Sequence, residues 1–189
     1  MKVTAITLRP GHVLDRGDGK LWAVTKYEIM QPGKGASVIQ VEMRDVRGGN
    51  KDNVRYRTQE TVERVRLDQG EYQFLYWEGD EAHFMNQESF EQITVPKDII
   101  GFAANFLQES MICTIETYEG APLGVEIPDQ VTMRIEQADP VVKGQTASSS
   151  YKPAILENGV KVMVPPHVES GIRIVIKTED GSYVERAKD

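Results

Sequence analysis

The sequence predicts an all-β protein made of small sandwiches or barrels. Short runs rich in β-branched and aromatic residues recur along the chain, at residues 21–27, 37–43, 72–77, 111–118 and 171–178. Turn signals separate these runs, such as Gly48-Gly49-Asn50, Glu78-Gly79-Asp80 and Asn158-Gly159. Short strands with such regular turn punctuation are typical of all-β architectures.

The first two runs, 21–27 and 37–43, lie on either side of Pro32-Gly33-Lys34-Gly35 and are expected to form a hairpin. Glycine on both sides of Lys34 permits backbone angles that are closed to other residues and leaves no neighbouring side chain in the way. Pro32 stiffens the approach to the loop. The loop therefore either presents one amine at the end of an arm or is an ordinary hairpin with an incidental lysine.

One segment between the later runs is predicted to be helical. Pro96 fits the first helical position, where its missing N–H carries no penalty. Apolar residues follow at helical spacing, namely Ile99, Phe102, Ala103 and Phe106. We expect a short helix of roughly ten residues that plugs or bridges a small barrel. The runs 72–77, 111–118 and 171–178 then complete the predicted strands.

Charge divides the 189-residue chain into three unequal parts, although its formal total is only -7. Residues 1–65 hold 12 Lys and Arg against 8 Asp and Glu, residues 66–127 hold 2 against 12, and the rest hold 8 against 9. One third of the chain is a workable size for a small barrel. We therefore predict domains at 1–65, 66–128 and 129–189, with an acidic middle domain.

Composition narrows the functional classes. An apolar fraction of 40% argues against disorder, and Cys113 has no partner in the chain for a disulfide. No apolar run approaches the roughly 18 residues that a membrane span needs. The first ten residues lack the apolar core of a signal peptide. We expect a soluble cytoplasmic protein with no membrane partner.

No constellation of residues points to catalysis, to a metal or to a cofactor. His12, His83 and His167 are far apart in the sequence, and Cys113 lies alone in a strand-like run, so no zinc pattern exists. A phosphate-binding loop needs Gly five positions before Gly33-Lys34 and Ser or Thr after it, but Glu28 and Gly35 stand there. We therefore expect a non-enzymatic protein.

A basic cluster near the end of the first third is the second feature of interest. It comprises Arg44, Arg47, Lys51, Arg55, Arg57, Arg64 and Arg66. Such a cluster is either a solvated charged face or a surface that faces phosphates. In the second case Arg55 and Arg57 are candidates for contacts with phosphates.

The sequence resembles the bacterial elongation factor P family over nearly its whole length. The first third matches in 11–14, 20–24 and the loop 32–35, and the middle third in 74–76, 78–80, 84–86, 90–92 and 122–128. The last third carries the most specific matches, at 152–154, 156–159, 162–165, 171–178 and 181–186.

The resemblance implies three β-barrels in an L-shaped, tRNA-like array: an SH3-like (KOW-type) barrel followed by two OB-folds. It also implies a translation elongation factor that binds the 70S ribosome beside the peptidyl-tRNA and relieves stalling at consecutive prolines. Ribosomal proteins are further expected partners. Such a factor positions the acceptor end of the peptidyl-tRNA while the ribosome makes the bond.

The resemblance also assigns site residues. Lys34 is the functional tip, supported by Pro32, Gly33 and Gly35, and is expected to carry a covalent β-lysyl group added by an enzyme similar to lysyl-tRNA synthetase. In the last barrel, Tyr183 and Arg186 match residues associated with tRNA and small-subunit contacts. Gly144 and Thr146 match a loop near the exit-site codon, although Ser148, Ser149, Ser150 and Tyr151 stand where the family often has Gly. With this resemblance, Arg55 and Arg57 are also candidates for contacts with tRNA or the ribosome.

Two alternatives remain open. A generic OB-fold protein that binds single-stranded nucleic acid would need a basic groove and stacking aromatics within one barrel, and the acidic middle third fits this poorly. A small enzyme would need a pocket that brings a His and Cys113 together.

Overall fold

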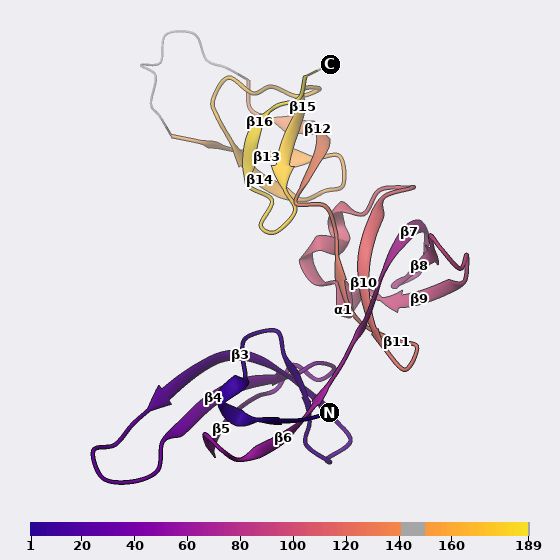
Figure 1. The fold of residues 1–189 in the computed structure, drawn as a ribbon. Helices are drawn as coiled ribbons and strands as arrows, with labels where there is room; N and C mark the ends of the chain where they lie inside the picture. Colours follow the sequence, from indigo (N-terminus) through magenta and orange to yellow (C-terminus); the bar gives the residue numbers. More distant parts are fainter. Residues whose placement is uncertain (141–149, 189) are drawn as a thin grey trace. The chain divides into compact units, whose positions relative to one another are not determined.

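The computed structural model describes residues 1–140 and 150–188, and the prediction of an all-β protein is confirmed. The strands of the described residues form three sheets, one of six and two of five strands (Figure 1). The chain divides into two compact units. The first comprises Met1–Gln69 and the tip of a later hairpin, Glu116–Leu123, and the second comprises Gly70–Ile115 and Gly124–Asp189.

The first unit is built on a six-stranded sheet with the order β1-β6-β2-β3-β4-β5. Its strands are β1 (Lys2–Thr4), β2 (Val13–Asp15), β3 (Leu21–Met30), β4 (Val38–Asp45), β5 (Lys51–Arg57) and β6 (Thr61–Val65), with a 3-10 turn η1 (Ala5–Thr7) after β1. Neighbouring strands are antiparallel. Alternation along β4 places Ile39, Val41 and Met43 in the core, each fully buried.

The second unit begins with a five-stranded sheet of order β11-β10-β7-β8-β9. Its strands are β7 (Asp68–Glu78), β8 (Glu81–Asn86), β9 (Gln92–Pro96), β10 (Ile112–Tyr118) and β11 (Ala121–Glu126). Cys113 lies in the core of this sheet with 2% of its surface exposed. Phe74 and Phe84 pack edge to face there, with ring centroids 5.6 Å apart.

The predicted helix is present but divides in two. It forms α1 (Lys97–Ile100) and a 3-10 turn η2 (Gly101–Phe106), because Gly101 has a φ of 75°, outside the helical region. Pro96 is the residue that caps α1 rather than its first helical residue. Ile100, Ala104 and Phe106 are buried, so the segment does fill the interior. Of the residues that the spacing predicted to face inward, however, only Phe106 is buried, Ile99 and Ala103 are half-buried, and Phe102 is 45% exposed, because the helix divides at Gly101.

The third sheet has the order β14-β13-β12-β15-β16. Its strands are β12 (Gln130–Ala138), β13 (Lys152–Leu156), β14 (Lys161–Val164), β15 (Arg173–Lys177) and β16 (Tyr183–Arg186). The two sheets of the second unit share one continuous core. Polar contacts also link them, because Asn158 Nδ2 donates to Asn105 O at 2.6 Å and Gln108 Nε2 donates to Thr132 O at 3.1 Å.

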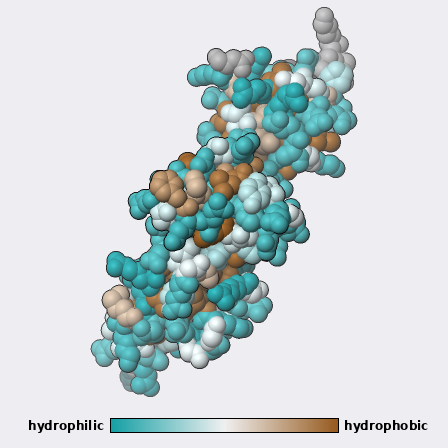
Figure 2. Space-filling model, turned by 90° about the vertical axis from the view of Figure 1, so that its right-hand side faces the viewer, coloured by the Kyte–Doolittle hydropathy of each residue, from teal (hydrophilic) through white to brown (hydrophobic). Residues whose placement is uncertain are grey.

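The face of the molecule that Figure 2 shows is largely hydrophilic, and apolar residues reach it only in small patches. No helix of the described residues has the length and apolar character to span a membrane. Two of the sequence-predicted contact residues, Gly144 and Thr146, lie outside the described residues, as do Ser148 and Ser149.

Candidate functional site

The loop that carries Lys34 joins the two longest strands of the first unit (Figure 1). Met30, the last residue of β3, pairs with Val38, the first residue of β4. Of the residues between them, 31–37, the first six are exposed and Ser37 is half-buried, and Lys34 lies at the middle of this stretch. Lys34 makes no ion pair with any residue of the described chain. Its ammonium group is therefore presented to solvent and to binding partners.

The two glycines beside Lys34 contribute differently. Gly35 has a φ of 136°, a conformation that favours glycine, whereas Gly33 has no such angle. A Cβ atom on Gly35 would lie 3.7 Å from Cγ of Pro32, and one on Gly33 would meet nothing within 4 Å. The expectation that both glycines serve the backbone thus holds for Gly35 alone, and Gly33 keeps the space beside Lys34 open.

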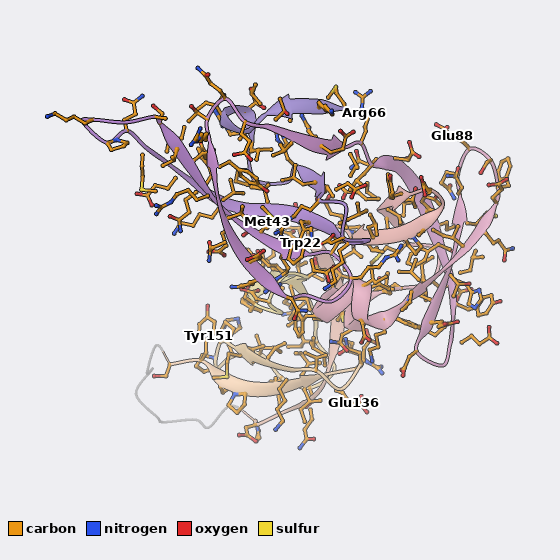
Figure 3. All side chains as sticks on the ribbon, turned by 90° about the horizontal axis from the view of Figure 1, so that it is seen from below. Trp22, Met43, Arg66, Glu88, Glu136 and Tyr151 are labelled. Carbon is orange, nitrogen blue, oxygen red and sulfur yellow. The ribbon has the colours of Figure 1, made fainter. Side chains whose placement is uncertain are left out.

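Strand β3 leaves the core of its unit before β4 does, because Ile39 and Val41 on β4, opposite Ile29 and Tyr27, are fully buried. Val24 is the last buried residue of β3, and the six residues that follow it in the strand are exposed or half-buried. At roughly 3.3 Å per residue, this outer part extends about 20 Å. Trp22 and Met43, labelled in Figure 3, lie at the inner end of the hairpin. We call residues 25–42 the arm.

A β-bulge sets the direction of the arm. The register shifts between Val24 and Lys26, so that Thr25 has no direct partner on β4. The Thr25 hydroxyl lies 3.2 Å from the carbonyl of Glu42 and 3.3 Å from its carboxylate Oε1, across the strand pair. An extra residue of this kind bends a strand and increases its twist. The bulge therefore re-aims the arm where it leaves the core.

A cation–π contact holds the base of the arm. The Arg9 guanidinium lies 4.7 Å from the centroid of the Tyr27 ring. The same group donates from Nη1 to the carbonyls of Ile6 and Leu8, at 2.9 and 2.7 Å. Because these carbonyls belong to η1 and its end, Arg9 links the arm to the body of the unit.

The structure divides the basic cluster instead of keeping it as one patch. Arg55 and Arg57 are exposed on β5, opposite Gln40 and Val38 of β4. Since Val38 begins β4, both arginines lie at the end of the sheet that leads to the Lys34 loop. Arg44 and Lys51 pair at the other end of the same strands. Arg47, Arg64 and Arg66 lie elsewhere, in the turn after β4, on β6 and beyond it.

Two other cations of the first unit, Arg16 and Lys20, already form ion pairs. Arg16 Nη1 lies 2.7 Å from Asp52 Oδ2, and Lys20 Nζ lies 3.8 Å from Asp45 Oδ2. Arg55 and Arg57 form no such pair within the described chain. Together with Lys34 they form a cationic strip, defined as Lys34, Arg55 and Arg57, that is available to bind an anion.

The remaining sequence-predicted contacts belong to the second unit. Arg186 is exposed at the end of β16, opposite Ile174. Tyr183, on the same strand, is half-buried and packs edge-on against Tyr151, with ring centroids 6.4 Å apart. These two residues are not part of the arm.

The described residues contain no assembled catalytic or metal centre. Burial raises the pKa of the Cys113 thiol to about 11, which keeps it protonated and unreactive. The pKa of His12 is lowered, first by burial and then by the charges of Arg64 and Arg9. No group of three metal-ligating side chains exists among the described residues.

Three residues that shape the site carried no signal in the sequence. Thr25 is identified as a bulge only by the register of β3 against β4. Arg9 and Tyr27 are 18 positions apart and meet only because η1 folds beside the arm. Alternation of polar and apolar residues in 51–57 did offer a strand signal for β5.

Comparison with known proteins identifies relatives of the whole chain. Family models match three successive segments: "Elongation factor P (EF-P) KOW-like domain" at residues 4–62, "Elongation factor P (EF-P) OB domain" at 67–125 and "Elongation factor P, C-terminal" at 131–186. A KOW-like domain followed by an OB domain is the barrel order that the resemblance implied, and it is confirmed.

Curated relatives match the sequence of this chain along its full length. The chain is 61% identical to elongation factor P of Rhodospirillum centenum over 189 residues, which is 100% of both chains. It is 54% identical to elongation factor P of Methylorubrum populi, again over 100% of both. A solved structure of eukaryotic translation initiation factor 5A from Methanococcus jannaschii shares the fold, with a TM-score of 0.55 and 20% identity over 68% of this chain and 92% of that one.

Proposed function

Because the chain belongs to the elongation factor P family, we propose that this translation factor binds the 70S ribosome beside the peptidyl-tRNA and promotes peptide-bond formation at consecutive prolines. The observation that carries the proposal is the unpaired Lys34 at the tip of the β3–β4 hairpin, in a loop whose residues 31–36 are all exposed. This narrow loop allows the amine to enter a site that the barrel itself is too wide to enter.

Proline creates the need for such a factor. Its ring fixes φ and restricts the residue before it, so successive prolines stiffen the nascent chain. The reacting groups then fail to align in the ribosome. Correct orientation of two reacting groups can supply several kcal/mol of the activation barrier. The factor therefore acts by holding the peptidyl-tRNA, while the ribosome carries out the chemistry.

The cationic strip is the part of the factor that holds the peptidyl-tRNA. Arg55 and Arg57 contact the phosphate backbone of the tRNA beside the Lys34 loop, and Lys34 contacts phosphates or 2′-hydroxyls at the acceptor end. Phosphate contacts of this kind fix position without reading sequence. Lys34 acts as a cationic anchor and not as a general base.

A covalent β-lysyl group on Lys34 extends this role. It lengthens the reach of the side chain and adds a second amine. The open surroundings of Lys34 leave room for it, since Gly33 has no neighbouring atom within 4 Å of its Cβ direction. An enzyme similar to lysyl-tRNA synthetase adds the group. Mass analysis of the Lys34 peptide from the native host tests this, and an unmodified lysine there would contradict it.

The alternative of a generic single-stranded nucleic-acid binder has less support. Residues 66–127, which include most of the first OB domain, hold 12 acidic against 2 basic residues. Phosphates are repelled by such a surface. Non-specific affinity for free RNA is therefore expected to be low.

Translation of a reporter with a run of prolines tests the proposed function. We expect Lys34→Ala to lower the stimulation by at least about tenfold, which corresponds to about 1.4 kcal/mol. A reporter without the proline run should be unaffected. Lys51→Ala removes the same charge from the far end of β5 and should retain most of the stimulation. A Lys34→Ala protein as active as the wild type would overturn the proposal.

A further inference from the structure

The outer surface of β7, β8 and β9 has no role in the function proposed above. Antiparallel pairing aligns Tyr76, His83 and Thr94 in one row across the three strands. Glu78 and Glu81 pair two positions further along, which is the next row on the same face of the sheet. We call these five residues the middle-sheet face. The second and third strands of an OB-fold are the usual place where this fold takes its ligand, and here they are β8 and β9.

Tyr76 is the centre of this surface. Its side chain is 51% exposed, although it lies in the middle of a sheet. One side of the ring stacks on His83, with centroids 4.5 Å apart and planes 13° apart. His83 is fixed in turn by Glu78 at 2.9 Å and Thr94 at 3.4 Å. Tyr76 is therefore a pre-positioned aromatic ring with one side available, which loses little freedom on binding.

Negative charge surrounds the ring. Glu78 and Glu81 face each other directly across the β7–β8 pair, and the turn between them adds Asp80. Like charges in directly opposite positions destabilise a sheet. No basic residue of the described chain forms an ion pair with Glu81 or Asp80. A cation bound at this place would remove the repulsion.

The chemistry of the surface restricts what it can bind. Carboxylates repel the phosphates of RNA, and no group of three residues there suits a metal ion. An aromatic ring bordered by carboxylates is the combination that binds a guanidinium or ammonium group, by cation–π contact and ion pairing. Glu88, labelled in Figure 3 on the loop after β8, continues the acidic character at the far end of the sheet.

We propose that the middle-sheet face is a docking surface for an arginine- or lysine-rich segment of a protein partner, with one cationic side chain stacked on Tyr76 and its neighbours paired with Glu78, Asp80 and Glu81. The partner is assigned by charge complementarity, because the carboxylates of this surface attract a cationic segment. The inference is independent of the role proposed for Lys34, because it concerns a different unit and a different class of partner.

A titration of the full-length protein with a defined peptide tests the proposal. The probe is a 12-residue peptide that alternates Arg and Gly, and its control replaces each Arg by Gln. Backbone amide shifts report the site of binding. We expect shifts at Tyr76, His83 and residues 78–81 with the Arg peptide alone. Tyr76→Ala should weaken binding about two- to fivefold, and Tyr76→Phe, which keeps the ring, should not.

Charge variants provide the matched comparison. Glu81→Gln should weaken binding by a similar factor, because it removes one ion pair. Glu109→Gln removes the same charge from an exposed loop outside the face and should have a smaller effect. Equal losses in these two variants would show general charge attraction and overturn the proposal. Unchanged binding by Tyr76→Ala, or the same amide shifts with a single-stranded RNA oligomer, would also overturn it.

Discussion

The guanidinium of Arg9 lies over the ring of Tyr27, 4.7 Å from its centroid, and joins the arm to the body of its unit. Tyr27 lies on the outer part of β3, opposite Val41, and packs half-buried against the core of the unit. A contact at this point limits how far the arm can swing. The direction of Lys34 thus depends on a residue that is remote from it in the sequence.

Loss of this contact is expected to loosen the arm without unfolding the unit. We predict that Arg9→Ala lowers the free energy of unfolding by about 1 kcal/mol, since cation–π contacts at exposed sites are worth about 0.5–1 kcal/mol. Amide hydrogen exchange in residues 26–30 should become faster. Arg9→Lys should restore part of the protection, and exchange that stays unchanged in Arg9→Ala would contradict the role of the contact.

The two loop glycines should respond differently to alanine. Gly35→Ala forces a residue with a Cβ into a φ of 136°, which costs roughly 1 kcal/mol or more and displaces Lys34 as the loop relaxes. We expect a severalfold loss of stimulation on the proline reporter. Gly33→Ala has no such angle and meets open space, so it serves as the matched control. Equal activity of the two variants would show that the loop backbone does not position Lys34.

Salt dependence should reveal the contribution of the cationic strip. Each phosphate contact adds about one to the slope of log affinity against log salt. Arg57→Ala is therefore expected to weaken ribosome binding and to reduce this slope by about one. Arg47→Ala, in the turn after β4 at the other end of the sheet, should leave the slope nearly unchanged. A normal slope in Arg57→Ala would exclude a phosphate contact.

His12 makes the first unit sensitive to acid. Its pKa is lowered from 6.5 by burial and by Arg64 and Arg9, so the unfolded chain takes up a proton more readily than the folded one. The stability that the neutral ring contributes is present above pH 6.5 and is lost as the pH falls through the lowered folded pKa. Protonation also removes Nδ1 as the acceptor for the Arg9 amide at 3.2 Å.

Urea unfolding between pH 7.5 and 5 measures this effect. We predict that His12→Gln flattens the fall in the unfolding midpoint over that range. His167→Gln, at an exposed position of the second unit, should retain the wild-type profile. If both variants follow the wild type, His12 is not the group responsible.

Local sequence predicted the parts of the structure that depend on neighbouring residues. Gly on both sides of Lys34, between two β-rich runs, was sufficient to place the loop at a hairpin tip. The predicted helix differs from the structure at Pro96, which is the N-cap and not the first helical residue, and at Gly101, where a positive φ divides it. The residues of β5 were interpreted as a charge cluster because three of the four exposed positions of the strand, Lys51, Arg55 and Arg57, are basic.

Contacts between distant segments were beyond this kind of prediction. The shared core of the second unit joins Phe106 to residues as far along the chain as Ile176. Stacking of Tyr76 on His83 likewise depends on the register of β7 against β8, which includes a shift at Leu75. Register of this kind is set by the packed sheet as a whole and not by the strand's own residues.

The bulge at Thr25 also limits how the arm can change in evolution. Side chains alternate between the two faces of a strand, so adding or deleting a single residue between Thr25 and Tyr27 would turn Tyr27 away from Arg9 unless the bulge changed with it. Beyond Tyr27, changes of two residues in each strand keep the faces in place. With the bulge unchanged, the reach of Lys34 therefore varies in steps of about 7 Å.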